Sequence, residues 1–176
     1  MNALPADWAE SSPLQRWRQP LPLAVFGTLR AGQRNHHLMQ ATPIVATRRA
    51  FLPHFRAEGI ELYFHADGSA PFEIFWYDPA GWEQVIGPVE ALEEFQPGIV
   101  TNGYHRSLAW LSLLPADFDH PAFACELELS RDLGLAPAAW AGFERVPCWI
   151  YSNLAQNRLA QQHGAAPLIW DGVVFP

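Results

Sequence analysis

One segment of the chain has the residue types of a substrate-binding turn. It follows an apolar run, and its five residues are Phe26, Gly27, Thr28, Leu29 and Arg30. Glycine has no side chain, so the backbone of such a turn can approach a ligand closely. Successive backbone N–H groups around a glycine bind a carboxylate or a developing oxyanion, and the threonine adds a hydroxyl. We expect this turn to bind the acidic part of a small molecule.

A second segment supplies a candidate general base, Glu93, beside a second acid, Glu94. A carboxylate beside an apolar pocket can take up and return a proton near neutral pH, because burial raises its pKa. Consecutive residues of a helix differ in direction by about 100°, so one acid can face a pocket while the other faces water. A solvated helix surface is the alternative interpretation of the same pair.

The helix that would position these acids has a clear start signal. Asp78 and Pro79 have the sequence of an N-cap followed by proline at the first helical position. Pro88 should break or kink the helix, so we expect two short helices here. The apolar residues behind the start recur at helical spacing; they are Trp82, Val85, Ile86, Val89 and Leu92.

Other catalytic and metal-binding patterns are absent from the sequence. His36 and His37 are adjacent, but no further histidine stands at metal-ligand spacing from them. The chain has no G-x-S-x-G, G-x-G-x-x-G or P-loop sequence. Cys125 and Cys148 are its only cysteines, and we expect two buried thiols in strands. The sequence therefore predicts neither a metal nor a cofactor.

The composition favours a folded protein that binds neither nucleic acid nor membrane. Of 176 residues, 49% are hydrophobic and 16% charged, whereas disordered chains are poor in apolar residues and rich in charge. Eleven basic residues against 18 acidic ones give a net charge of −7, and nucleic-acid binding needs a basic face. No stretch resembles a signal peptide or a transmembrane helix. We expect a cytoplasmic protein.

Strand and helix signals alternate along the chain without repeats or a linker. Residues 1–20 read as an N-terminal extension with one short helix capped by Ser12, and residues 21–176 as a single domain. A last helix is predicted from Asn153 to His163, ending at Gly164. Strands are predicted at 21–26, 60–64, 72–77, 107–114, 123–129 and 146–151, with a turn at 65–69. This mixture predicts an α+β fold.

Two motifs in this order resemble the γ-glutamylcyclotransferase-like family, which includes plant avirulence-induced proteins and γ-glutamylamine cyclotransferases. The family opens with an apolar strand leading into Tyr-Gly-[Ser/Thr]-Leu, and Phe26 stands here in place of Tyr. Next comes Leu-Asp-x-[Leu/Phe]-Glu-Gly-[Tyr/Phe], matched by residues 89–95 with Glu93 as the catalytic Glu and Glu94 in place of Gly. Tyr104 and Arg106 match a following Tyr-x-Arg. The resemblance covers roughly residues 21–151.

The resemblance implies a mixed β-sheet that closes into a small barrel surrounded by short helices. It implies an enzyme that cyclises a γ-glutamyl amino acid or amine to 5-oxoproline and releases the amine. Glu93 would be its general acid/base, and residues 26–30 would bind the substrate. The nucleophile belongs to the substrate, so this chemistry uses no metal and no cofactor. In the family Tyr104 and Arg106 have a partly structural role, and neither is given a catalytic one. A strand start with a surface salt bridge is the alternative interpretation of the two residues.

Three alternatives stay open at the level of the sequence. In a shifted register Leu92 to Gln96 would match Leu-Asp-x-Phe-Glu, with Gln96 in the catalytic place and no activity. The chain could also be a non-catalytic small-molecule-binding protein that keeps the turn, since Phe26 and Glu94 both depart from the family motif. It could finally be a structural or protein-interaction member of the same fold, as its N-terminal extension and eight Trp allow.

Overall fold

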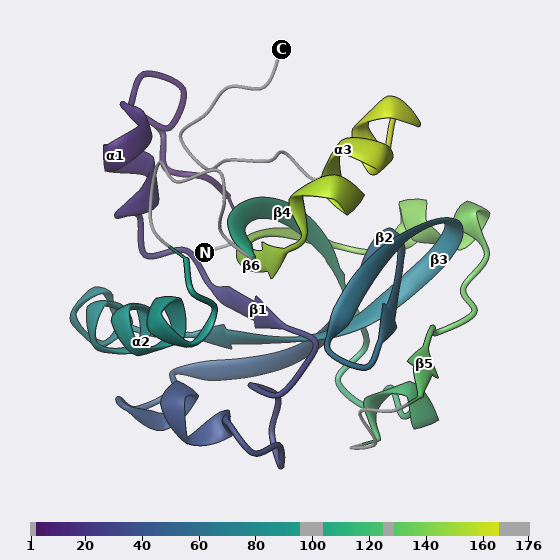
Figure 1. Cartoon of the computed structure of the whole chain (residues 1–176), viewed down its shortest axis with the longest axis horizontal. Coiled ribbons are helices and arrows are strands. Elements are labelled where there is room, and N and C mark those ends of the chain that lie inside the picture. The colour runs from purple at the N-terminus through teal and green to yellow at the C-terminus, as the bar shows by residue number, and fades with distance from the viewer. Residues whose placement is uncertain (1–2, 96–103, 125–128, 166–176) are drawn as a thin grey trace.

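The computed structural model describes residues 3–95, 104–124 and 129–165. Its centre is one mixed sheet that closes on itself (Figure 1). The strands run in the order β3-β1-β6-β4-β2-β5, and β2 also pairs with β3, so five strands form a barrel that β5 extends. They are β1 (Leu23–Val25), β2 (Ala46–Glu58), β3 (Glu61–Trp76), β4 (His105–Leu113), β5 (Ser130–Arg131) and β6 (Arg145–Ser152). The predicted mixed sheet closing into a small barrel is confirmed.

Short helices surround the barrel, as the sequence predicts, and several begin or end at the expected cap. Ser12 and Gln15 form a reciprocal capping box, Asp78 accepts from the N–H of Gly81, and Gly164 ends the last helix with φ of 70°. The helices are α1 (Pro13–Trp17), α2 (Pro79–Leu92) and α3 (Leu154–Gln162), with 3-10 helices η1 (His36–Gln40), η2 (Pro121–Phe123) and η3 (Pro137–Gly142). No helix in this described part of the chain could span a membrane.

Alternating side chains of the strands contribute to two of the three hydrophobic cores, one inside the barrel and one beneath α2. Ala109 and Leu111 of β4 belong to the inner core, whereas Leu108 belongs to the outer one, as the two-residue period of a strand requires. Trp82 and Val85 of α2 pack into the outer core. This packing holds the C-terminal end of α2 close to the end of β1.

The largest departure from expectation is β3, where the predicted turn at 65–69 does not divide two strands. One strand of 16 residues runs through it, paired with β2. Phe55 pairs with both Phe64 and Ser69, so residues 65–68 form a large bulge in β3, and His54 is the unpaired residue of β2 beside it. Gly68 is required there, because a Cβ would lie 2.5 Å from the Phe55 carbonyl oxygen. The chain reverses instead at Gly59, whose φ is 57°.

Two smaller expectations also fail. Helix α2 continues through Pro88 as one element, since a single proline deletes only one backbone hydrogen bond and Val85 and Val89 keep both halves packed on the barrel.

The strand predicted at 123–129 does not begin at Phe123. This residue ends η2, and its backbone N–H donates to the His120 carbonyl. Residues 125–128, including Cys125, lie outside the described part. Cys148 is a buried thiol in β6, as predicted.

Candidate active site

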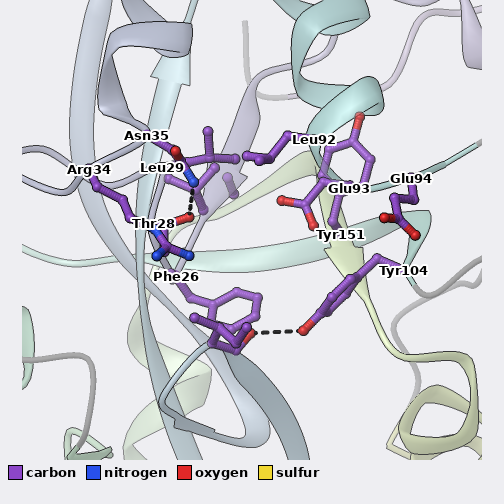
Figure 2. A pocket seen from close by; sticks show the side chains of 14 residues that line it. Phe26, Thr28, Leu29, Arg34, Asn35, Leu92, Glu93, Glu94, Tyr104 and Tyr151 are labelled. Carbon is purple, nitrogen blue, oxygen red and sulfur yellow. Dashed lines mark hydrogen bonds between the residues drawn. The ribbon is translucent and has the colours of Figure 1, made fainter.

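A cavity of about 290 Å³ opens where the end of β1, the end of α2 and the tip of the β2–β3 hairpin meet (Figure 2). The turn after β1 forms one wall through Phe26, Gly27, Thr28 and Leu29, and the opposite wall carries Glu93. The structure thus brings the two candidate segments to one cavity, although more than 60 residues separate them in the sequence.

The turn is held by the loop that follows it. The Asn35 side-chain amide donates to the Thr28 hydroxyl at 2.9 Å, and the Asn35 backbone N–H donates to the Thr28 carbonyl at 3.0 Å. Phe26 packs its ring on Phe72 inside the barrel, with centroids 5.3 Å apart. The backbone N–H groups of Gly27, Thr28 and Leu29 donate to no backbone carbonyl among the described residues. Asn35 therefore fixes the turn at Thr28, and the three residues with these N–H groups line the cavity.

Neither the backbone conformation nor the packing around position 27 requires a glycine there. The φ of Gly27 is not positive, and an added Cβ would meet only the Ile60 Cα, at 4.0 Å. A glycine in a turn at the end of a strand normally allows a left-handed backbone conformation. Gly27 does not adopt that conformation. What the missing side chain leaves open is space on the cavity wall.

Arg30 does not belong to the cavity, and its predicted place in the substrate-binding turn is wrong. Its side chain is 1% exposed and donates to the carbonyl oxygens of Phe123 and Ala124, at 3.4 and 3.2 Å. The backbone N–H of Arg30 donates to the Gly27 carbonyl, and this tight turn directs residue 30 away from the wall formed by residues 26–29. Arg30 anchors the turn to η2.

Glu93 is the residue that ends α2, and its half-buried carboxyl group points into the cavity (Figure 2). Burial raises the pKa of this group from 4.5 to about 7, because a carboxylate loses hydration when apolar groups surround it. Its position at a helix C-terminus, where carbonyl dipoles disfavour an anion, acts in the same direction. At neutral pH both protonation states of Glu93 are populated.

Glu94 has a structural role that explains where the helix stops. Its φ is 54°, and the next residue, Phe95, donates its backbone N–H to the Glu90 carbonyl at 3.0 Å. This bond and the left-handed residue before it form a Schellman motif, in which glycine is the usual occupant. The turn of the chain buries Phe95 and leaves the Glu94 side chain exposed at the cavity rim.

Two tyrosines complete the wall around Glu93, and the sequence did not place either of them there. Tyr104 donates its hydroxyl to the Ile60 carbonyl at 3.1 Å, which ties the hairpin tip to the cavity. Burial, followed by the nearby Glu61 and Glu93 charges, raises the pKa of Tyr104. Burial also raises the pKa of Tyr151. Both phenols therefore remain neutral beside the carboxyl group.

Arg34 is a second residue of the cavity that the motif did not include. Its guanidinium lies on the side of the turn (Figure 2) and makes no ion pair with any residue in the described part. The sequence indicates a role for Arg34 in the site only weakly, because a cation in a glycine-containing loop is common at protein surfaces. It supplies the positive charge of an otherwise acidic cavity.

Arg106 is buried, so the alternative interpretation of a surface salt bridge does not hold. Its side chain is 3% exposed, and its guanidinium pairs with Glu90 at 2.9 Å and donates to the Trp17 carbonyl at 2.7 Å. The rings of Trp149 and Phe95 lie 4.9 and 5.8 Å from the guanidinium carbon, close enough for cation–π attraction. Arg106 therefore holds the last turn of α2 against the barrel, one turn before Glu93.

No cluster of three or more His, Cys, Asp or Glu side chains suited to a metal ion occurs in residues 3–95, 104–124 and 129–165. Gln96, on which the shifted register depends, lies outside these residues. The polar groups at the cavity are instead a carboxyl with a pKa near neutrality, two phenols, a guanidinium and three backbone donors. Such a set suits proton transfer on a small anionic molecule.

Comparisons with known proteins were made by sequence and by structure. No family model matches the chain, and no curated protein matches its sequence. Among solved structures, the chain is similar to the crystal structure of an AIG2-like protein from Mus musculus. The superposition has a TM-score of 0.46 and 17% sequence identity, and it covers 76% of this chain and 77% of the mouse protein.

Proposed function

We propose that the protein is a γ-glutamyl cyclotransferase, which converts a γ-glutamyl amino acid or amine to 5-oxoproline and releases the amine. Glu93 is the general acid/base, and the turn from Phe26 to Leu29 binds the γ-glutamyl group. One observation carries the proposal: a carboxyl group with a pKa of about 7 faces that turn across a cavity of about 290 Å³. This volume lies near the lower end, about 300 Å³, of small-molecule sites.

The reaction needs protons to be moved and one conformation to be held. Glu93 takes a proton from the substrate's α-ammonium group, and the freed amine attacks the γ-carbonyl carbon. The new C–N bond closes the five-membered ring as the amide C–N bond breaks, and Glu93 returns its proton to the leaving nitrogen. Glu93 then takes the second proton from the ring nitrogen and passes it to the released amine, which leaves as an ammonium ion while Glu93 is again a carboxylate. A group whose pKa lies near the working pH does both steps efficiently. A substrate held in a folded conformation has its amine already placed next to the γ-carbonyl carbon, which lowers the entropic cost of the attack.

The turn has the groups that would hold the substrate. The backbone N–H groups of Gly27, Thr28 and Leu29 match the oxygens of an α-carboxylate, or of the oxyanion that forms at the γ-carbon. The open space at Gly27 lets these oxygens reach the backbone. Phe26 lacks the hydroxyl of the family's Tyr, so the neutral phenols of Tyr104 and Tyr151 remain as the aromatic hydroxyls near Glu93.

The backbone around Glu93 supports the register in which it is the catalytic acid. In the family motif a glycine follows the catalytic Glu, and Glu94 occupies that place here. The left-handed φ of 54° at Glu94 is the conformation that favours glycine. The cavity position of Glu93 and the conformation of Glu94 therefore agree with one alignment of the motif.

A non-catalytic binding protein is the second candidate, and the replacement of Tyr by Phe26 favours it. In that case the cavity would bind a γ-glutamyl compound or its product without converting it. The shifted register, with Gln96 in the catalytic place, leads to the same outcome. Inactive wild-type protein that gains activity in the Gln96→Glu variant would establish this alternative.

The test of the proposed function is direct assay of the purified protein. We expect incubation with a panel of γ-glutamyl amino acids and γ-glutamyl amines to release 5-oxoproline, measured by mass spectrometry, together with one equivalent of free amine. α-Glutamyl dipeptides are the matched control, because their amide bond is at the α-carboxyl group, so ring closure onto the free γ-carboxyl would expel water and release neither amine nor free 5-oxoproline. Absence of product from every γ-glutamyl compound, with binding retained, would leave the non-catalytic protein as the correct description.

A further inference from the structure

A second cavity, of about 490 Å³, shares no lining residue with the first. It is bounded by β2, β4, the start of β6, η3 and the two residues Gly164 and Ala165 that follow α3. The chemistry proposed for the first cavity uses none of its residues. Five polar or aromatic side chains make it a candidate binding site in its own right: His54, Trp110, Ser112, Trp140 and Arg145.

The floor of this cavity has a buried hydroxyl group without a partner. Ala109, Leu111 and Leu113 of β4 belong to the barrel core, so Trp110 and Ser112, which alternate with them, face the outer side where the cavity lies. Ser112 is 1% exposed, and its hydroxyl makes no hydrogen bond to any described residue. Such a group is costly unless a bound molecule satisfies it.

A cation stands directly beside that hydroxyl. Arg145 of β6 is the cross-strand partner of Ser112, and partners in an antiparallel pair direct their side chains to the same face. Arg145 is exposed and forms no ion pair with a residue in the described part of the chain. Its planar guanidinium is suited to two parallel hydrogen bonds from a carboxylate. A serine hydroxyl and a free guanidinium therefore occupy one end of the cavity.

The rings of Trp140 and His54 form an aromatic wall of the same cavity, and hydrogen bonds to other residues hold both rings in position. Trp140 donates its indole N–H to the Leu135 carbonyl at 3.2 Å, and the His54 ring meets it edge to face, with centroids 4.6 Å apart. His54 is fixed in turn, because its φ is 66° and its Nδ1 lies 2.8 Å from the Ala66 carbonyl. That carbonyl only accepts, so Nδ1 donates. Rings held before a ligand arrives lose little entropy on binding.

We propose that this second cavity is a binding site for a small aromatic carboxylate. The carboxylate group binds Arg145 and accepts a hydrogen bond from the Ser112 hydroxyl, and the ring packs against the indoles of Trp110 and Trp140. The free guanidinium selects an acid over a neutral sugar or alcohol, and the indoles select an aromatic acid over an aliphatic one. Binding here is independent of turnover in the first cavity.

The test is titration of the full chain with a matched set of probes, followed by NMR of the indole N–H groups. Benzoate, 4-hydroxybenzoate and indole-3-carboxylate should bind saturably and shift the signals of Trp110 and Trp140, which Trp→Phe variants assign. Benzamide lacks the charge and acetate lacks the ring, so both should bind about tenfold or more weakly. No saturable binding of any aromatic carboxylate would overturn the proposal.

Two arginine variants separate this cavity from the first. Arg145→Gln should weaken benzoate binding about tenfold or more, whereas Arg34→Gln, which removes the cation of the first cavity, should leave it unchanged. Ser112→Ala should weaken binding less, and thermal unfolding would show that each variant remains folded. Binding lost in Arg34→Gln and kept in Arg145→Gln would place the ligand in the first cavity and refute the assignment.

Discussion

Replacing Glu93 by Gln should stabilise the protein at alkaline pH, because the folded state holds this carboxyl where its charge is disfavoured. The pKa is raised from 4.5 to about 7, which corresponds to about 3 kcal/mol at about 1.4 kcal/mol per tenfold change in proton affinity. Glu93 is only half-buried and keeps part of its water, so we expect about 2 kcal/mol. For a chain of this size that is a rise in Tm of about 4–8 °C.

The direction of the pH dependence follows from the raised pKa. Below about pH 4.5 Glu93 is protonated in both the folded and the unfolded state, and wild type keeps its full stability. Between that pH and about 7 the unfolded state releases the proton first, so wild-type stability falls as the pH rises through the folded-state value. The Gln side chain cannot ionise, so the difference between variant and wild type should grow from pH 5 to pH 8 and then level off.

The assay is urea unfolding of wild type and Glu93→Gln at intervals from pH 5 to pH 8. Glu94→Gln is the matched control: it changes the adjacent, exposed acid and should keep the wild-type pH dependence. A Glu93→Gln curve that runs parallel to wild type, or falls below it at pH 8, would show that Glu93 is not held in a charge-disfavouring site.

Three glycine-related substitutions test the local geometry. Glu94→Gly should stabilise the protein by about 1 kcal/mol in urea unfolding, because it relieves a left-handed residue of φ 54°; a destabilised variant would contradict the Schellman interpretation. Gly27→Ala should keep the wild-type Tm, since its Cβ meets nothing closer than 4.0 Å, yet raise KM for the γ-glutamyl substrate; an unchanged KM would exclude the turn from binding. Gly68→Ala should lose about 1–3 kcal/mol, because its Cβ would lie 2.5 Å from the Phe55 carbonyl oxygen, and a wild-type unfolding midpoint would argue against the bulge.

The parts of the fold that the sequence predicted are those set by local chemistry. Ser12, Asp78 and Asn153 begin helices because their side chains accept from the free N–H groups of the first turn. The turn signal at residues 65–69 was misleading because pairing with β2 along 13 residues outweighs local turn preference. Gly68 allows the two strands to approach each other closely, and the chain does not reverse there.

The candidate site was predicted in part for a similar reason. Glu93 and the turn at Gly27 could be found because each lies in a recognisable local motif. Arg34 and Tyr151 enter the cavity through the loop after the turn and the end of β6, and no local pattern reports such a contact. Arg30 was misassigned because its direction depends on carbonyl groups of η2 more than 90 residues away.

The central claim is that Glu93 is the general acid/base of a cyclotransferase, and one comparison tests it most directly. Single-turnover formation of 5-oxoproline from a saturating γ-glutamyl amino acid should be about 10²–10⁴-fold slower in Glu93→Gln than in wild type. The wild-type rate should rise through an inflection at about pH 7, since the base form must take up the ammonium proton. Wild-type rates in a folded Glu93→Gln variant would contradict the account.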